Sequence, residues 1–324
     1  MASADFSKIG FVGLGAMGKP MVERLVAKLP HDAKIHVYDA ICTPMEDLGA
    51  KYPDKVILCD SPKDVTVASN FIITMVPEGK HIRAVYFDEI GIIRAGDLSN
   101  KIFIDCSTID LETSALVQYY VTQSHPTALF YDAPVSGGAQ SAEQGTVAFY
   151  IGCPENDPRL GLITELLSLM GSSVTPCGMP QGGLTAKICN NYLSGLIAIG
   201  SSEALNMGIR AGLDPRVLSR VFAAGAAQNA VCDRFNPCPG VVPDAPSSKD
   251  YEGGFKVQLM KKDFALAVDL AESVDAALAV GYQALEVYQA AARDPDCMDR
   301  DSRVVFRFLG GDERWAERFP KDEA

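Results

Sequence analysis

The residue best placed to do chemistry is Lys187, in the segment QGGLTAKICNN at residues 181–191. Asn190 and Asn191 follow it at i+3 and i+4, so on a helix the amine and the two amides share one face. Histidine is the usual group for moving protons near neutral pH, but the part of the chain around and after this segment contains none. Lys187 is therefore the best candidate for acid–base chemistry. The chain has four histidines, none after residue 125: His31, His36, His81 and His125.

A glycine-rich segment near the start of the chain, GFVGLGAMGKPM, indicates a nucleotide site. It has the spacing GxGxxG and lies between the strand-like run KIGFV and a helix expected to start near Ala16. In this motif the first glycine permits a tight turn, the second lets the backbone approach a pyrophosphate, and the third lets helix pack on strand. The pyrophosphate would lie at the positive helix N-terminus. We expect contacts from Gly13, Leu14, Gly15, Ala16, Met17 and Gly18.

The choice of cofactor depends on Asp39, at the end of the next strand-like run, KIHVYD. A carboxylate at this position accepts hydrogen bonds from both ribose hydroxyls and repels a 2′-phosphate. The residues that follow include no arginine to bind such a phosphate: Ala40, Ile41, Cys42 and Thr43. The sequence therefore predicts NAD rather than NADP.

Two further apolar runs end in residues that would line the cofactor crevice. MVP places Val76 and Pro77 there for packing, and CST places Thr108 there for a hydrogen bond. For each run taken singly, an ordinary strand terminus fits equally well.

The segment APVSGG offers a hydroxyl and successive backbone N–H groups at Ser136, Gly137 and Gly138. Such groups can form an anion-binding concavity. Since the pyrophosphate is already assigned to the first loop, this one suits a substrate carboxylate, with a simple turn as the alternative.

The elements that position these residues change in character near residue 180. Residues 8–152 alternate short β-rich runs with amphipathic stretches, which is typical of a doubly wound α/β domain with a mostly parallel sheet. Beyond residue 183 helical periodicity dominates, and one helix of nearly thirty residues is expected to end near residue 212. We expect a Rossmann-type NAD-binding domain at 7–180, an all-helical domain at 181–312 joined by that long helix, and a charged, loosely held tail at 313–324.

Composition narrows the class of protein. With 48% apolar and 22% charged residues the chain has the mix of a soluble globular protein, and its net charge of −12 argues against nucleic acid or an anionic membrane as a partner. The longest apolar run, YLSGLIAIG, is too short to span a bilayer. The nine cysteines show no CxxC pattern, which favours reduced thiols over disulfides or a zinc site. The first eight residues, MASADFSK, resemble neither a signal peptide nor an arginine-rich transit peptide.

Three motifs together, GLGAMG, DAPVSGG and KICNN, resemble those of the β-hydroxyacid dehydrogenase family. The segments NMGIRAGLDP, FNPCPGV, YEGGF and LMKKDFALA extend the similarity over essentially residues 8–310. The resemblance implies a Rossmann-type domain followed by an all-helical domain, with assembly into a homodimer or homotetramer through the helical part.

The resemblance also implies roles for single residues. The family's catalytic lysine corresponds to Lys187, its substrate-binding amide to Asn190 with Asn191 adjacent, and its carboxylate-binding loop to Ser136–Gly138. Its cofactor-contacting lysine corresponds to Lys262, which would otherwise be taken for an ordinary lysine on a helix surface.

The chain departs from the family pattern at two other residues and in the connection LPHDAK at residues 29–34, which is longer than in many relatives. His81 lies near the expected nicotinamide ribose contact, where relatives often carry a smaller polar residue, and it is retained as a candidate cofactor contact. Arg24 replaces an asparagine that is common at its helix position.

The implied reaction is reversible NAD-dependent oxidation of a small 3-hydroxy acid, 3-hydroxyisobutyrate, to methylmalonate semialdehyde, a step of valine breakdown. Lys187 would accept the hydroxyl proton in its neutral form. A lysine pKa of about 10.4 is too high for this, and burial together with the cationic nicotinamide ring would lower it. No metal is expected, because the ammonium form can stabilise the developing oxyanion.

Two alternatives remain open. One is an NAD-linked reductase of another small semialdehyde, such as tartronate or succinic semialdehyde, and the other is a non-catalytic binding homologue. Eukaryotic members of the family are mostly mitochondrial, so the resemblance implies the mitochondrial matrix, with the cytoplasm as the alternative.

Overall fold

The computed structural model describes residues 5–320 of the 324-residue chain. The chain divides into two compact units, and the division falls directly after Lys187. This point lies inside one long helix, α8 (Gly182–Arg210), so the first turns of α8 belong to the first unit and its remainder to the second. The domain boundary expected from the sequence, between residues 180 and 181, lies just before this helix.

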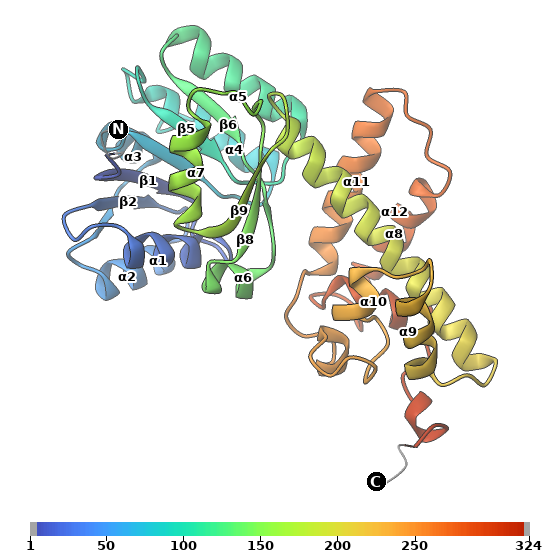
Figure 1. Ribbon diagram of the computed structural model, residues 1–324. Coiled ribbons are helices and arrows are strands. Elements are labelled where there is room, and N and C mark those ends of the chain that lie inside the picture. Colours follow the sequence, from blue (N-terminus) through green and yellow to red (C-terminus); the bar gives the residue numbers. More distant parts are fainter. Residues whose placement is uncertain (1–4, 321–324) are drawn as a thin grey trace. The chain divides into compact units, whose positions relative to one another are not determined.

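The first unit is built on a parallel sheet (Figure 1), whose strand order is β3-β2-β1-β4-β5-β6. The order reverses between β1 and β4, which is where ligands bind in doubly wound sheets. Thr74 pairs with Asp105 and Asp105 with Asp132, so the carboxyl ends of these strands meet at one edge. The strands are β1 (Lys8–Val12), β2 (Lys34–Tyr38), β3 (Val56–Leu58), β4 (Phe71–Thr74), β5 (Ile102–Asp105) and β6 (Leu129–Asp132).

Helices cover both faces of this sheet, and the strands read as continuous apolar runs for that reason. Ile73 and Ile104 face the core formed with α1 and α2, whereas the neighbouring Ile72 and Phe103 face the core formed with α4 and α5. The Rossmann-type fold predicted from the sequence is confirmed. The helices are α1 (Gly18–Lys28), α2 (Cys42–Lys51), α3 (Pro62–Ala68), α4 (Gly79–Phe87), α5 (Leu111–Ser124) and α7 (Leu160–Ser168).

A second, three-stranded sheet follows in the same unit. Its strand β7 (Val135–Ser136) pairs antiparallel with β8 (Val147–Ile151), which pairs parallel with β9 (Gly171–Pro176). The short helix α6 (Ala139–Gln144) connects β7 to β8. The strand predicted at VAFYIG is therefore present as β8 but lies outside the main sheet, next to two strands that the sequence pattern did not reveal.

The second unit is helical, as predicted, and is organised around α8, whose 29 residues agree with the expected length. A Cβ on Gly195 would overlap the ring of Phe264, so this glycine allows α11 to pack closely on α8. The buried hydroxyl of Tyr288 donates to the Gly195 carbonyl at 3.0 Å and links α12 to the same point. The remaining helices are α9 (Pro215–Ala224), α10 (Ala230–Arg234), α11 (Val257–Ser273), α12 (Gly281–Ala291) and α13 (Val305–Phe308).

The segment after α13 is anchored, so the expectation of a loosely held tail is wrong for residues 313–320. Trp315 is 3% exposed, and its indole N–H donates to the Pro239 carbonyl at 2.8 Å. The guanidinium of Arg216 lies 5.2 Å from the centre of that ring and donates to the Phe319 carbonyl at 2.9 Å. Residues 321–324 of the predicted tail lie outside the described residues.

Within residues 5–320, none of the helices is both long enough and apolar enough to cross a membrane. That part of the chain also contains no group of three or more His, Cys, Asp or Glu side chains arranged to hold a metal ion.

Candidate active site

The glycine loop between β1 and α1 has the geometry of a dinucleotide site. Gly13 has φ +97° and donates to the Tyr38 carbonyl at 2.9 Å, which makes the turn out of β1 tight. A Cβ on Gly18 would overlap the Gly13 carbonyl, whereas a Cβ built on Gly15 would meet no atom of the described residues within 4 Å apart from its chain neighbours. The backbone at Gly15 is therefore open to a ligand, which is the role expected of the second glycine.

The start of α1 also fits an anion. The helix begins at Gly18, two residues later than expected, and its cap residue, Met17, makes no side-chain capping hydrogen bond. The first turn carries no acidic residue. Backbone N–H groups at a helix start that side chains do not cap can bind phosphate oxygens, so the loop fits the pyrophosphate.

Asp39 lies directly after β2 and is bound to the glycine loop. One of its carboxylate oxygens accepts the Leu14 N–H at 2.5 Å, and the other accepts the Ile41 N–H at 2.8 Å. Each oxygen retains a second lone pair for a ribose hydroxyl. Asp39, which is predicted to bind the adenosine ribose, therefore also fixes the loop that is expected to hold the pyrophosphate.

A buried network supports the predicted cofactor contacts after β4 and β5. Asp105 is 1% exposed and accepts hydrogen bonds from the Thr74 hydroxyl at 2.8 Å and the Ser107 N–H at 3.1 Å. The Ser107 hydroxyl in turn accepts the Val76 N–H at 2.9 Å. Burial raises the pKa of Asp105 to about 6 despite these hydrogen bonds. The backbone at Val76 is therefore held by a carboxylate that the sequence analysis did not single out.

The other predicted contacts at this edge lie in the same two loops. Pro77 directly follows Val76, and Thr108, half-buried, lies three residues beyond the end of β5. His81 is in the first turn of α4, and its Nδ1 is buried without a hydrogen-bond partner among the described residues. The structure thus brings Val76, Pro77 and Thr108 to the carboxyl edge, with His81 at the start of the adjoining helix.

The predicted carboxylate loop lies where β7 ends and α6 begins. Ser136 is the last residue of β7, Gly137 has φ +129°, and Gly138 is the cap residue of α6. Since L side chains rarely adopt that φ, the loop requires glycine at position 137. Arg24 donates to the Glu143 carbonyl at the end of α6, so this departure from the family pattern contacts the helix that follows the loop.

The helix that carries Lys187 is fixed to the sheet at its first turn. The buried carboxylate of Asp132, the last residue of β6, accepts the N–H groups of Gln181 and Leu184, both at 2.8 Å. Lys187 itself is 6% exposed. No role in the site was predicted from the sequence for Asp132 or Asp105. Each is a charged residue at the end of an apolar strand, and this position could have indicated a buried hydrogen-bond acceptor.

In the second unit, α8 and α11 are joined by polar side chains. Asn190 is exposed and donates to the side-chain oxygen of Asn191 at 3.2 Å. Asn191 is buried and donates to Asp263 at 2.5 Å, and the amine of Lys262 lies 3.1 Å from the other oxygen of that carboxylate. Three predicted residues therefore meet through Asp263, which the sequence analysis noted only as a neighbour of Lys262. Because the Asn191 amide is bound internally, Asn190 is the amide more available to substrate.

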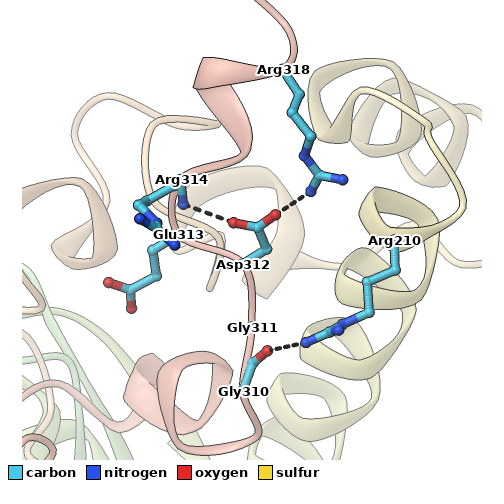
Figure 2. Close-up of a pocket in the computed structure, with 7 residues that line it drawn as sticks. All are labelled: Arg210, Gly310, Gly311, Asp312, Glu313, Arg314 and Arg318. Atoms are coloured by element: carbon cyan, nitrogen blue, oxygen red, sulfur yellow. Dashed lines mark hydrogen bonds and ion pairs between the residues drawn. The ribbon is translucent and has the colours of Figure 1, made fainter.

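A cavity of about 750 Å³ near the C-terminal segment is lined by none of the predicted residues. It lies between the end of α8 and the C-terminal segment, and Figure 2 shows that two of the lining arginines bind acceptors in that segment. Arg318 pairs with Asp312, and Arg210 donates to the Gly310 carbonyl at 2.9 Å. Its polar groups serve to anchor the segment that contains Trp315.

Two protein-family models match most of the chain. The NAD-binding domain of 6-phosphogluconate dehydrogenase matches residues 8–178. A model described as the NAD-binding region of NADP-dependent 3-hydroxyisobutyrate dehydrogenase matches residues 182–309. The first of these confirms an NAD-binding domain over the predicted sheet.

Curated proteins and solved structures agree with these matches. The mitochondrial 3-hydroxyisobutyrate dehydrogenase of Rattus norvegicus is 36% identical over 313 residues, covering 96% of this chain and 89% of the rat protein. The 3-hydroxyisobutyrate dehydrogenase of Pseudomonas aeruginosa is 37% identical over 88% of this chain and 92% of its own length. The structure of Mycobacterium tuberculosis 3-hydroxyisobutyrate dehydrogenase with L-serine has a TM-score of 0.85 at 30% identity, covering 94% of this chain and 99% of that one.

Proposed function

We propose, because this chain belongs to the 3-hydroxyisobutyrate dehydrogenase family, that it catalyses the reversible NAD-dependent oxidation of 3-hydroxyisobutyrate to methylmalonate semialdehyde. The observation that carries the proposal is the placement of Lys187. It is a buried lysine on a helix whose first turn is hydrogen-bonded to β6, at the sheet edge that carries the glycine loop.

In this proposal Lys187 accepts the proton of the substrate hydroxyl. Burial disfavours its ammonium form and so favours the neutral amine that the oxidation needs. Once protonated, the same group stabilises negative charge on the developing carbonyl oxygen in the reverse direction. Bound NAD supplies the acceptor for the hydride that leaves C3.

Substrate orientation is assigned to two groups. The backbone N–H groups and the hydroxyl of Ser136–Gly138 bind the carboxylate, supported by the φ of +129° at Gly137. Asn190 holds the substrate near the lysine, and Asn191 orients that amide through the 3.2 Å hydrogen bond between them. Lys262, whose amine is paired with Asp263, contributes to cofactor binding.

Cofactor preference is assigned to Asp39. Its carboxylate lies at the end of β2 beside the glycine loop, where it would bind the adenosine ribose and repel a 2′-phosphate. This position of Asp39 supports NAD as the cofactor, although the protein-family model that matches residues 182–309 is named after an NADP-dependent enzyme. Val76, Pro77 and Thr108 are proposed as further cofactor contacts, and His81 as a contact near the nicotinamide ribose.

The deciding experiment is a panel of kcat/KM values with NAD and with NADP. The substrates are 3-hydroxyisobutyrate, 3-hydroxypropionate, serine, glycerate and lactate. We expect 3-hydroxyisobutyrate to have the highest kcat/KM. Loss of its methyl group, as in 3-hydroxypropionate, should lower kcat/KM by a factor that corresponds to roughly 1–3 kcal/mol of transition-state stabilisation. Serine, present with the M. tuberculosis structure, should react more weakly because an ammonium replaces the methyl. Lactate should react poorly because its hydroxyl is one carbon too close to the carboxylate.

The same panel separates the alternatives. Preference for tartronate or succinic semialdehyde in the reductive direction would identify another semialdehyde reductase. NAD binding without turnover of any substrate would identify a non-catalytic homologue. A profile led by glycerate or lactate would contradict the assignment to 3-hydroxyisobutyrate.

Assembly and location complete the proposal. We expect a homodimer or homotetramer formed through the helical unit, which light scattering of the purified chain would determine. We also expect the mitochondrial matrix, a proposal supported by the word mitochondrial in the rat protein's name, although the P. aeruginosa relative shows that the family includes bacterial proteins. Fractionation of the source cells would distinguish this from the cytoplasm.

A further inference from the structure

The N-terminus of α8 is capped by a residue about fifty positions earlier in the chain. Asp132 ends β6, and its two carboxylate oxygens accept one N–H each: Oδ1 from Gln181 and Oδ2 from Leu184, both at 2.8 Å. Helices are usually capped by the residue just before them, which accepts a single N–H with its side chain. Here the cap belongs to the sheet, so it ties the helix to a strand end.

The space around this carboxylate is shaped for aspartate. A Cβ on Gly152 would overlap Oδ1, and a Cβ on Gly183 would lie 2.9 Å from Oδ2 and overlap the Tyr150 carbonyl. Both positions are glycine, and both backbones surround the carboxylate. An asparagine would place an N–H₂ group against one of the two backbone donors.

The residue that enters the helix is itself held in a strained conformation. Gln181 has φ +58°, a left-handed backbone that non-glycine residues rarely adopt. Its N–H is bound by Asp132, and its side-chain amide donates to Gln118 on α5 at 2.7 Å. Strain of this kind persists only where the surroundings over-determine the conformation. The start of α8 is therefore fixed rather than frayed.

The charge of the buried carboxylate is consistent with this arrangement. Burial raises the pKa of Asp132, and the backbone N–H groups that it accepts oppose that change. The oxygens also face the positive end of the α8 dipole, which stabilises an anion.

We propose that Asp132 is a positioning residue: it fixes the first turn of α8, and thereby Lys187, relative to the strand ends that carry the cofactor loops. Lys187 follows Leu184 by three residues, which is about 4.5 Å along the helix axis. A shift of the first turn therefore passes directly to the amine. The inference rests on the proposed role of Lys187 in proton transfer.

The test compares Asp132→Asn with Asp157→Asn. Asp157 is the control because its carboxylate also accepts a backbone N–H, from Arg159 at 2.7 Å, and a hydroxyl, from Tyr131 at 3.2 Å, and neither donor belongs to α8. We expect Asp132→Asn to lower kcat about ten- to a hundredfold, since a misplacement of about 1 Å has effects of that size. The NAD dissociation constant should stay within about twofold of wild type. Asp157→Asn should keep kcat, and both variants should retain the wild-type circular dichroism spectrum.

Amide hydrogen exchange gives a readout that does not depend on turnover. In Asp132→Asn the amides of Gln181 and Leu184 should exchange at least about tenfold faster, and Asp157→Asn should leave them unchanged. If Asp132→Asn does not fold, Asp132→Ser takes its place, because its hydroxyl can still accept one of the two N–H groups.

The outcomes separate this inference from the proposed function. If the wild-type protein fails to oxidise 3-hydroxyisobutyrate, the proposed function is overturned. The positioning by Asp132 can still be tested then, by amide exchange and by the rate at which acetic anhydride labels the Lys187 amine in each variant. Active wild type with unchanged exchange at residues 181 and 184 would overturn the positioning alone. So would faster exchange with a kcat within about twofold of wild type, or an equal loss of kcat in Asp157→Asn.

Discussion

Replacing Asp105 with asparagine should make the first unit more stable at neutral pH. The carboxylate is 1% exposed, and its Oδ2 has no hydrogen-bond partner among the described residues, although Oδ1 accepts from Thr74 and Ser107. An asparagine can keep its oxygen at the Oδ1 position and retain both of these hydrogen bonds. It removes the buried charge and the repulsion from Asp132 on the neighbouring strand.

The magnitude follows from the shift in pKa. Burial raises the pKa of Asp105 from 3.8 to about 6, so between these values the folded state keeps a proton that the unfolded chain has lost. Stability therefore falls as the pH rises through this window, by about 3 kcal/mol in all. Asparagine does not titrate. Near pH 4 the free energy of unfolding of the variant should differ from that of wild type only by the effect of replacing a carboxylic acid with an amide. Above pH 7 it should be larger than that of wild type by about 1–3 kcal/mol.

The assay is urea unfolding of both proteins at several pH values between 4 and 8. Amide exchange at β5 provides a parallel measure, because it reports on the first unit alone. Groups distant from Asp105 titrate equally in both proteins, so the difference in unfolding free energy reports on Asp105 and its repulsion with Asp132. A difference that stays constant from pH 4 to pH 8 would refute the raised pKa. A variant that becomes less stable as the pH rises would show that the carboxylate is bound by a donor.

Three further predictions concern catalysis, cofactor choice and the C-terminal segment. Lys187→Met should lower kcat at least about a thousandfold with little change in NADH affinity, and a variant that keeps a tenth of the turnover would exclude this lysine from proton transfer. Wild type should prefer NAD to NADP by at least about a hundredfold in kcat/KM, and Asp39→Ala with Ala40→Arg should narrow or reverse this; equal use of both cofactors by wild type would contradict the role of Asp39. Trp315→Ala should destabilise the helical unit by about 3–5 kcal/mol, measured by urea unfolding, because it removes a buried aromatic side chain and its hydrogen bond to Pro239; a loss below about 1 kcal/mol would mean that the segment is not anchored there.

Features set by neighbours in the chain were predictable from the sequence. The glycine loop, the strands of the main sheet and the 29-residue helix each have a local pattern, and the family assignment that followed from the motifs is confirmed. The helix start near Ala16 was placed two residues early, since α1 begins at Gly18. Gly18 lies against the Gly13 carbonyl, a close approach that the local pattern did not place at the helix start.

Features set by distant residues were not predictable. The strand β7 has two residues and β9 is the polar run GSSVTP, so neither has an alternating pattern, and both form because β8 lies between them. The capping of α8 joins residues 49 and 52 positions apart, and the contact of Trp315 with Pro239 joins residues 76 apart. Each depends on which elements meet in space, and one sequence carries no record of that.

The anchoring of Trp315 makes the chain suitable for fluorescence spectroscopy. It is the only tryptophan in the sequence, and its indole is buried, hydrogen-bonded and covered by a guanidinium in the helical unit. Tryptophan emission therefore comes from one known position, and its shift to longer wavelength would report release of the C-terminal segment into water. Followed alongside amide exchange at β5, this emission would show whether the two units unfold together or separately, with no label added to the protein.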